Sequence, residues 1–374
     1  MSHASHLLRP LDKLFVKDGR PLSLEDDSAA SGLFPPPPSV VYGALRSAVL
    51  AQADDLLAAI GTDADPATQN ARLSGVAFAK TAPDATQALY FPAPADLTRA
   101  KEKDPKTRAG LAATRAGLLP DDVGLTSAPT SRLLGPPHGS GPVESAGGYV
   151  SGAGLVAYLR GEEVPASQLT EASALYGAEP KLGIALDYGS RTTGDGLLYT
   201  MAMQRLCDGV TLAVQTSGFG ASLPPLLRLG AEARAAEVLP MSLEWPAAVP
   251  PEGSTFTLYL ATPAVFRNGW LPDFLDAETL TGRLAGAEVR LLAASTGKYV
   301  PLGGWDIAAR RPKPMRKAVP AGAVYHLEIT GGDLDAAAVH GRPLPTNYDH
   351  ASYPQQGFGI AYLGAGPSEI PPTK

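Results

Sequence analysis

The stretch Leu197–Thr216, LLYTMAMQRLCDGVTLAVQT, carries the clearest hairpin signal in the sequence. Two runs rich in apolar residues, Leu197–Leu206 and Val210–Thr216, flank the dipeptide Asp208-Gly209. Asp-Gly is favoured in tight hairpin turns because glycine readily adopts the left-handed backbone conformation that these turns require. The stretch therefore predicts two antiparallel strands joined at Asp208-Gly209, and with them a fold built on antiparallel sheets.

The start of the chain predicts a strand, a rigid loop and a helix, in that order. Leu7–Val16 (LLRPLDKLFV) is mostly apolar and ends at a turn signal, which favours a strand. The four prolines Pro35–Pro38 favour a stiff extended segment and cannot lie inside a helix or a central strand. Ser39 is a suitable N-cap, and the apolar residues among 40–49 recur at helical spacing.

Further apolar runs predict the remaining elements. Strands are expected at 75–79, 88–91, 182–187, 223–229, 255–261, 287–293 and 323–330, and a short helix at 273–284. Between these runs, the pattern is lost from about Pro92 to Gly154, which we interpret as a long, loop-rich insertion. The proline-rich segment Trp245–Gly253 marks a boundary between two domains, residues 1–246 and 247–374. Hairpins mixed with single helices predict an α+β fold with antiparallel sheets.

Composition excludes several classes of protein. The 374 residues include 44% hydrophobic and 18% charged residues, which is typical of a globular protein and excludes a disordered one. Cys207 is the only cysteine, so the chain can form neither an internal disulfide nor a thiolate zinc site. Residues Met1–Pro10 lack the pattern of a signal peptide, and no apolar run is long enough to span a membrane. We therefore expect a soluble, cytoplasmic protein.

Motifs for catalysis are weak throughout the chain. Gly152–Ala157 matches a dinucleotide-binding pattern, but a loop entering a helix is the better interpretation because no clear buried strand precedes it. Gly331-Gly332-Asp333 is interpreted as a β-turn, since no second strand follows to complete a metal-binding hairpin. The six histidines show none of the spacings of metal or hydrolase sites. The sequence thus predicts a protein that is not an enzyme and holds no metal or cofactor.

Charge is distributed unevenly along the chain. The net charge of -6 argues against nucleic acid as a partner only if the charge is uniform. However, residues 98–115 have a net charge of +4 and residues 297–320 a net charge of +5. The second segment contains Lys298, Gly303, Gly304 and Trp305; glycines allow close approach of a phosphate backbone, and a tryptophan can stack on a base. An exposed loop with a buried tryptophan is the equally weighted alternative.

Several segments, taken in order, resemble one protein family. They are LRPLDKLFVKDGRPL (Leu8–Leu22), GLFPPPPSVVYGALRSAV (Gly32–Val49), LGIALDYGSRTTGDGLLYT (Leu182–Thr200), LATPAVFRNGW (Leu260–Trp270), and VPLGGWD with RPKPMRKAVPAGAVYHLE (Val300–Glu328). Together they resemble the third subunit of the Cmr effector complex of type III-B CRISPR systems, within the RAMP superfamily. The resemblance implies two tandem ferredoxin-like (RRM-like) domains, each ending near a glycine-rich loop.

The resemblance also implies where RNA binds. The segment around Gly303 and Trp305 matches the family well, which assigns guide-RNA binding to Lys313, Arg316 and Lys317. The two glycine-rich loops would add Arg234, from the first, and Gln356, Gly357, Phe358 and Gly359, from the second. On the residues alone, the second loop could equally be a β-bulge or a barrel-like corner.

The implied function is that of a scaffold without catalytic activity. Such a subunit binds the 5′ handle of the CRISPR RNA, docks the large polymerase-like subunit and starts the backbone of RAMP subunits. One alternative is a metal-independent RAMP endoribonuclease that processes CRISPR RNA, with Tyr42 or His326 as general base. The other is the equivalent subunit of a type III-A complex. None of these functions requires a membrane.

Overall fold

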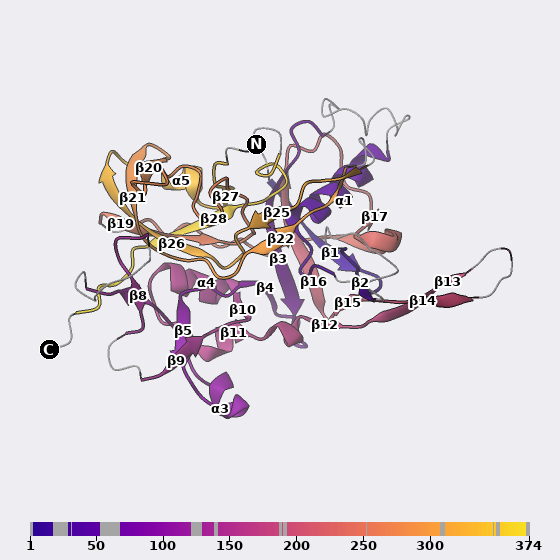
Figure 1. Ribbon diagram of the computed structural model, residues 1–374, viewed down its shortest axis with the longest axis horizontal. Helices are drawn as coiled ribbons and strands as arrows, with labels where there is room; N and C mark the ends of the chain where they lie inside the picture. Colours follow the sequence, from indigo (N-terminus) through magenta and orange to yellow (C-terminus); the bar gives the residue numbers. More distant parts are fainter. Residues whose placement is uncertain are drawn as a thin grey trace.

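The structure is a computed structural model of the chain. It describes residues 3–17, 29–30, 32–52, 68–120, 129–137, 141–186, 189, 193–251, 253–306, 311–346, 348 and 352–371. Two large antiparallel sheets lie side by side, the first built mainly from residues before 241 and the second from residues after 254 (Figure 1). The predicted α+β class with antiparallel sheets is therefore confirmed.

The first sheet has eight strands, and its two faces have different packing partners. Its order is β11 (Leu169–Thr170), β10 (Tyr149–Ser151), β4 (Gln87–Pro92), β3 (Arg72–Thr81), β16 (Val210–Ser217), β1 (His3–Pro10), β18 (Ala235–Pro240) and β17 (Leu226–Arg228). Alternating residues of a strand face opposite sides of a sheet. Leu8 packs toward helix α1 (Pro38–Leu50), whereas its neighbour Leu7 joins the cluster that contains α4 (Gly152–Leu159).

The predicted N-terminal order of strand, proline-rich loop and helix is confirmed, with three corrections. Strand β1 covers His3–Pro10 instead of Leu7–Val16, and Pro38, which was expected outside any helix, is the first residue of α1. Helix α1 begins at Pro38, and its N-cap is Pro37, which makes no side-chain cap hydrogen bond. The prediction of Ser39 as N-cap is thus wrong, because the fixed backbone angle of proline suits the first helical turn. Val41 and Leu45 lie on the buried face of the helix, toward the sheet.

The Asp208-Gly209 turn forms, but the strands do not pair as the sequence predicted. Gly209 has a φ of 73°, and strand β16 follows it. Strand β16 pairs with β3 and β1, whereas β15 (Gln204–Leu206) pairs with β12 (Tyr176–Ala178). A turn is fixed by local backbone chemistry, but a strand chooses its partner by packing across the whole sheet.

The second sheet has six strands around a core of its own. Its order is β20 (Thr281–Leu284), β21 (Ala287–Ser295), β26 (Val324–Gly331), β19 (Thr255–Leu260), β28 (Ile360–Ala365) and β27 (Arg342–Pro343). Its four central strands follow the same chain order, β21-β26-β19-β28, as β3-β16-β1-β18 in the first sheet. The proposed boundary segment Trp245–Gly253 lies between the last strand of one sheet and the first of the other.

The helix expected at 273–284 is wrong. The carboxylate of Asp276 accepts hydrogen bonds from the backbone N–H groups of Glu278 and Thr279 and closes a turn instead. Strand β20 follows, and Gly282 lies so close to Phe274 that a Cβ would meet its carbonyl oxygen. Beyond this segment, the described part of the second domain contains one helix, α5 (Ala336–Val339).

The insertion from about Pro92 to Gly154 is more ordered than the sequence predicted. Its described part forms β5 (Leu97–Ala100), α3 (Pro105–Ala109), β6 (Thr114–Arg115), β7 (Gly117–Leu118), β8 (Leu134–Gly135), β9 (Val143–Ser145) and β10. Arg115 donates to the carbonyl oxygens of Ala365 and Gly366, and Leu118 is hydrogen-bonded to Ser368 and Ile370. The insertion thus lies against the end of β28 and contacts the part of the chain that forms the second sheet (Figure 1).

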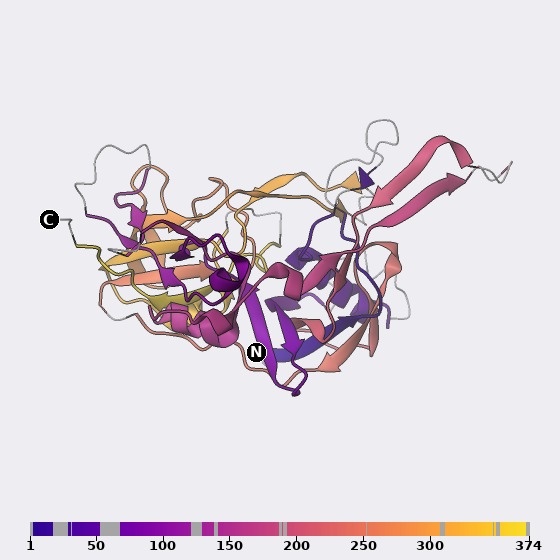
Figure 2. The same cartoon turned by 90° about the horizontal axis from the view of Figure 1, so that it is seen from below.

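A two-stranded ribbon projects from the first domain. Its strands are β13 (Lys181–Leu186) and β14 (Thr193–Met201), and β14 also pairs with the short strand β2 (Ala29–Ala30). Figure 2 shows the ribbon extending beyond the body of the protein. In the described part of the chain, no helix is long and apolar enough to cross a membrane.

Candidate nucleic-acid interface

A long hairpin carries the second basic segment. Strand β22 (Val300–Leu302) pairs with β25 (Arg316–Ala318), and further out β23 (Trp305–Asp306) pairs with β24 (Arg311–Pro312). The backbone N–H of Lys313 donates to the carbonyl of Gly304 between the two paired stretches. We call the described residues 298–306 and 311–318 the basic hairpin. It extends from the second domain toward the first (Figures 1 and 2).

The root of the basic hairpin is anchored by one face only. Val300, Leu302 and Ala318 pack in a cluster with Val265 and Phe358. Because side chains alternate across a ribbon, the opposite face, with Pro301 and its cross-strand partner Lys317, points away from this cluster. The root of the hairpin therefore has an inner face that packs on the protein, with Arg316 beside its apolar residues, and an outer face that carries Lys317.

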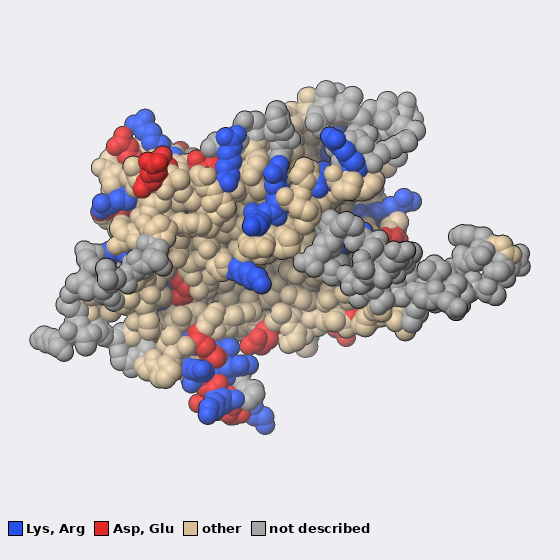
Figure 3. All heavy atoms as spheres, in the orientation of Figure 1, with Lys and Arg blue, Asp and Glu red and all other residues tan. Residues whose placement is uncertain are grey.

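Positive charge gathers on this hairpin, whose described residues include a single acid, Asp306, opposite Arg311 in the strand pairing. Lys298, Arg311, Lys313 and Lys317 are exposed, and Arg316 is half-buried. Between side chains that the structure describes, Lys298, Lys313, Arg316 and Lys317 form no ion pair with an acid. Figure 3 shows Lys and Arg side chains over the middle of this face, where the hairpin lies, with Asp and Glu gathered toward its edges. Such a patch attracts phosphates despite the acidic net charge.

Two of the predicted RNA-binding cations rest on tyrosine rings. The Nζ of Lys317 lies 5.1 Å from the ring centre of Tyr299 on the outer face. The guanidinium carbon of Arg316 lies 4.8 Å from the ring centre of Tyr348. Contacts of this kind orient a cation and leave its N–H donors available to other groups.

Trp305 is exposed, with 58% of its surface accessible to solvent. The alternative of a buried tryptophan in an ordinary loop is therefore wrong. Gly304 beside it is also exposed, and a Cβ there would make only an ordinary contact, 3.6 Å from Cδ of Lys313. The space around Gly304 and Trp305 is thus open to a ligand.

The second glycine-rich loop lies beneath the hairpin instead of beside it. Phe358 is only 4% exposed and packs in the root cluster, so its ring offers no free face for stacking. Gly357 has a φ of 86°, and its carbonyl accepts a hydrogen bond from Thr262. Gln356 is half-buried and donates to Ser352, while Gly359 has a φ of 73°. These residues support the hairpin root.

Arg234 lies apart from the hairpin, in a network of ion pairs at the root of the projecting ribbon. Its guanidinium contacts Asp12 at 2.5 Å and Glu232 at 2.7 Å. The network continues through the following pairs: Lys181 with Glu232, Arg205 with Asp12, and Glu179 with both Arg205 and Lys13. The structure therefore does not bring Arg234 together with the other predicted site residues.

The acids of this network are held in their charged form. Hydrogen bonds from Arg205 and Lys13 lower the pKa of Glu179 to about 2. The hydrogen bond from Lys181 is the main cause that lowers the pKa of Glu232. Carboxylates with such a lowered pKa stay ionised at neutral pH, so Arg234 remains paired there.

The first basic segment, 98–115, is dispersed by the fold. Arg99 is buried and lies between Glu144 and Glu171, and Arg108 also approaches Glu144. Arg115 is occupied by backbone carbonyls. Lys101, Lys103 and Lys106 remain exposed, next to the acids Glu102 and Asp104. This segment therefore presents mixed charge.

The two side chains considered as general bases for RNA cleavage are both buried. Tyr42 lies on the packed face of α1. His326 has no exposed surface, and its ring nitrogens contact Thr257 and Asp96. Tyr42 is only 8% exposed, so neither side chain is placed to contact RNA in this structure. Within that part of the chain, no group of three or more His, Cys, Asp or Glu side chains could hold a metal ion.

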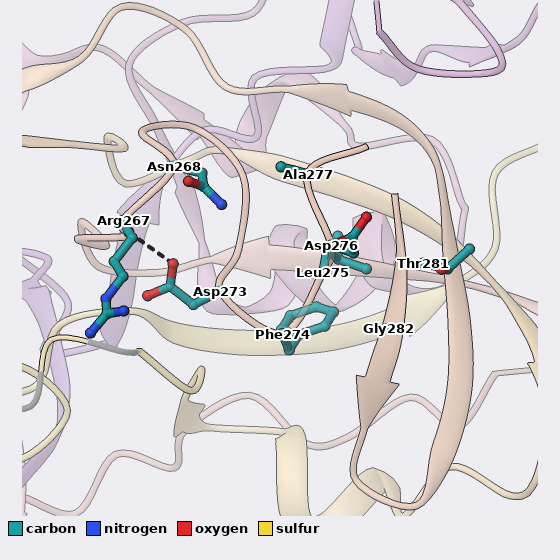
Figure 4. A pocket seen from close by; sticks show the side chains of 9 residues that line it. All are labelled: Arg267, Asn268, Asp273, Phe274, Leu275, Asp276, Ala277, Thr281 and Gly282. Carbon is teal, nitrogen blue, oxygen red and sulfur yellow. Dashed lines mark hydrogen bonds between the residues drawn. The ribbon is translucent and has the colours of Figure 1, made fainter. Parts of the chain in front are cut away.

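Two pockets lie near the C-terminal domain. One, of about 550 Å³, is lined by the loop 267–277 and β20 (Figure 4). Asp273 and Asp276 line it, but both carboxylates already accept backbone hydrogen bonds. The other, of about 260 Å³, is apolar and lies between Pro35–Pro38, the face of β3 and the hairpin root. It places the proline-rich segment beside the hairpin.

Tyr299 and Tyr348 are parts of this surface that sequence reasoning missed. Tyr299 follows Lys298 directly, so the basic segment contained a signal for it. Tyr348 is 32 residues from Arg316 in the chain, and only the fold brings the two together. No pattern in the sequence marked that contact.

The structure of the chain is similar to subunits of two type III-B Cmr-beta complexes bound to cognate target RNA, one of them also with AMPPnP. The TM-scores are 0.48 and 0.47, the identities 14% and 15%, and the match covers 86% of each chain. A Csm3-Csm4 subcomplex of a type III-A interference complex matches with a TM-score of 0.35 and 8% identity, covering 88% of this chain and 94% of the other.

The sequence of the chain identifies its family. No curated protein matches the chain. The model of the family described as CRISPR-associated protein (Cas_Cmr3) matches residues 6–365, which is nearly the whole chain. The chain therefore belongs to the Cas_Cmr3 family of CRISPR-associated proteins.

Proposed function

We propose that this protein is a non-catalytic subunit of a type III-B CRISPR effector complex that binds the 5′ handle of the CRISPR RNA on its basic hairpin. The observation that carries the proposal is the exposed hairpin itself, whose described lysines form no ion pair with a described acid and which presents Trp305 to solvent. Membership of the Cas_Cmr3 family supports the CRISPR context.

The chemistry of the hairpin suits a single strand of RNA. Lysine and arginine bind phosphates at any sequence, and aromatic rings stack on unpaired bases. A hairpin that stands out from its domain can also be reached by a strand along its length. A duplex would bury its bases and leave Trp305 without a partner, so we assign the unpaired handle to this surface.

Charge reversal tests the proposal. The double variant Lys313→Glu, Lys317→Glu should lose RNA from the natively purified complex, measured as CRISPR RNA recovered per complex. In fluorescence anisotropy with the full chain and labelled single-stranded handle RNA, it should bind more weakly than wild type. The slope of log K against log salt should fall by about 0.7 for each phosphate contact removed.

The matched control changes the same number of charges elsewhere. Lys101→Glu with Lys103→Glu alters two exposed lysines of the first basic segment, which already lies among acids. This control should retain guide RNA. Equal occupancy in the hairpin variant and wild type, or equal losses in the two double variants, would contradict the proposal.

Other roles belong to the same proposal. We propose that the subunit docks the large polymerase-like subunit, starts the backbone of RAMP subunits and acts in the cytoplasm. Co-purification from native cells tests these partners, and it also separates this role from that of a type III-A subunit. Incubation of the purified chain with repeat RNA in EDTA tests the endoribonuclease alternative, which requires cleavage at a defined site.

We further propose that the two domains are tandem ferredoxin-like units. The shared strand order, β3-β16-β1-β18 and β21-β26-β19-β28, supports this arrangement, since each order places the first strand between the third and the fourth. Each unit thus contributes one antiparallel sheet, and the basic hairpin is an excursion between β21 and β26 of the second unit.

A further inference from the structure

The aromatic side chains of the basic hairpin are unusual within this protein. Among the large hydrophobic residues that the structure describes as strongly exposed, two are aromatic: Tyr299, at 50% exposure, and Trp305, at 58%. Both lie in the hairpin, and Met315 of the same hairpin is also exposed. The other described aromatic rings are mostly packed in the cores. Exposed rings on a charged ribbon indicate a surface that meets a ligand with flat apolar faces.

Each exposed ring has a lysine beside it. The ammonium of Lys317 lies over the ring of Tyr299 at 5.1 Å. Lys313 flanks Trp305, because its backbone N–H donates to the carbonyl of Gly304 and its Cδ borders the open space at Gly304. A ring that stacks on a base, together with an ammonium that binds the adjoining phosphate, forms a binding site for one nucleotide. The hairpin has two such sites, one at Tyr299 and one at Trp305.

Tyr299 and Trp305 are too far apart to stack on neighbouring bases of one strand. Trp305 is six positions after Tyr299, and an extended strand rises about 3.3 Å per residue, which gives a separation of about 20 Å. Stacked neighbouring bases are separated by only about 3.4 Å along a strand. A single RNA strand that used both rings would therefore run along the length of the hairpin and place other nucleotides between them.

We propose that Tyr299 is a second base-stacking residue for the RNA handle, with Lys317 binding the adjoining phosphate, and that the strand runs lengthwise from Tyr299 to Trp305. This inference rests on the proposed function, since it needs RNA on the basic hairpin. It gives Arg316 a different role from Lys317: the stacking of Arg316 on Tyr348 positions the inner side of the hairpin.

Aromatic substitutions separate stacking from charge. In anisotropy with the full chain and labelled single-stranded handle RNA, Tyr299→Leu should weaken binding about fivefold to hundredfold, as loss of one stacked base does. Tyr299→Phe keeps the ring and should bind like wild type. The salt slope should not change in either variant, because neither loses a phosphate contact, whereas Lys317→Met should lower the slope by about 0.7.

Abasic RNA locates the contacts. Removing one base at a time from the handle should weaken binding by wild type at the positions that stack. At the position that stacks on Tyr299, removing the base should not weaken binding by Tyr299→Leu any further. In Trp305→Leu the same should hold at a different position, which is not adjacent to the first. Equal melting temperatures of these variants and wild type would show that the fold is intact, as expected for exposed side chains.

These experiments separate the stacking role of Tyr299 from the proposed binding of RNA on the hairpin. If Lys313→Glu, Lys317→Glu weakens RNA binding but Tyr299→Leu binds like wild type, the stacking role of Tyr299 is wrong and the proposed function stands. If neither the charge variant nor the aromatic variants change RNA binding, the proposed function is wrong. If Tyr299→Leu keeps its RNA but loses a protein subunit from the complex, the ring contacts a protein and the inference is overturned.

Discussion

Nε2 of His326 lies 2.9 Å from Oδ2 of Asp96, although the two residues are 230 positions apart and both side chains are fully buried. Asp96 belongs to the insertion, and His326 belongs to β26 in the second sheet. Tyr158 of α4 donates to the other carboxylate oxygen of Asp96 at 2.7 Å, and Thr257 contacts the other ring nitrogen of His326. This network connects the insertion, the first domain and the second sheet.

Asp96→Ala should lower the free energy of unfolding by about 3–5 kcal/mol, because it leaves Nε2 of His326 and the hydroxyl of Tyr158 buried without the carboxylate that they contact. Urea unfolding followed by circular dichroism measures the change. The control is Glu288→Ala, which breaks an exposed ion pair with Arg283. The Arg283 side chain is 79% exposed and the Glu288 side chain 55%. That variant should lose less than about 1 kcal/mol. Similar losses in the two variants would mean that the buried network does not hold the domains together.

Two glycines should respond to alanine in opposite directions. Gly357 has a φ of 86°, and a Cβ there would lie 3.0 Å from the carbonyl oxygen of Leu73, so Gly357→Ala should destabilise the protein by more than about 1 kcal/mol. A Cβ added at Gly43, inside α1, would meet nothing within 4 Å beyond its own helix, and Gly43→Ala should stabilise by up to about 1 kcal/mol. Thermal unfolding of both variants checks the prediction. A stabilised Gly357→Ala would show that the loop does not need its left-handed backbone.

Arg234 should matter less for RNA than the lysines of the hairpin. Its guanidinium is paired with Asp12 and Glu232, whose charges offset its own. We expect Arg234→Met to bind handle RNA within about twofold of wild type, whereas Lys313→Met should bind more weakly and with a lower salt slope. Anisotropy titrations at several salt concentrations compare the two. An equal fall in slope for both variants would place Arg234 on the path of the RNA.

The parts of the fold that local chemistry determines could be predicted from the sequence. The helix after the proline run, the turn at Gly209 and the strand around His326 all form as predicted. Partners of strands could not be predicted in this way, because pairing depends on packing between distant segments. The helix expected at 273–284 failed for a local reason, since the turn formed by Asp276 competes with a helix.

The candidate site was predicted in part for the same reason. The charges of the hairpin are local in the sequence, and they stay together because β22 and β25 pair with each other. The charges of 98–115 are equally local, yet Arg99 and Arg115 are drawn into contacts with distant segments. Phe358 looked like an exposed aromatic residue of a glycine loop, but its burial depends on Leu302 and Val265, far away in the chain.

His340 makes stability depend on pH in one direction. Burial lowers the pKa of His340, although the hydrogen bond to the carbonyl of Pro246 acts in the opposite direction. Its Nδ1 accepts the N–H of Leu363, which a protonated ring could not do. The folded protein thus favours the neutral ring, whereas the unfolded chain takes up a proton near the ordinary pKa of about 6.5. Stability from this group is present above that pKa and is lost as the pH falls below it.

His340→Gln tests this dependence, because the amide offers one donor and one acceptor but does not titrate. The free energy of unfolding of wild type should fall between about pH 7 and pH 5 more steeply than that of the variant. His6, whose pKa burial also lowers, contributes to both proteins and cancels in the difference. Urea titrations at several pH values measure the two slopes. Equal slopes would mean that His340 takes up its proton equally well in the folded and unfolded states, and that the contact with Leu363 does not constrain it.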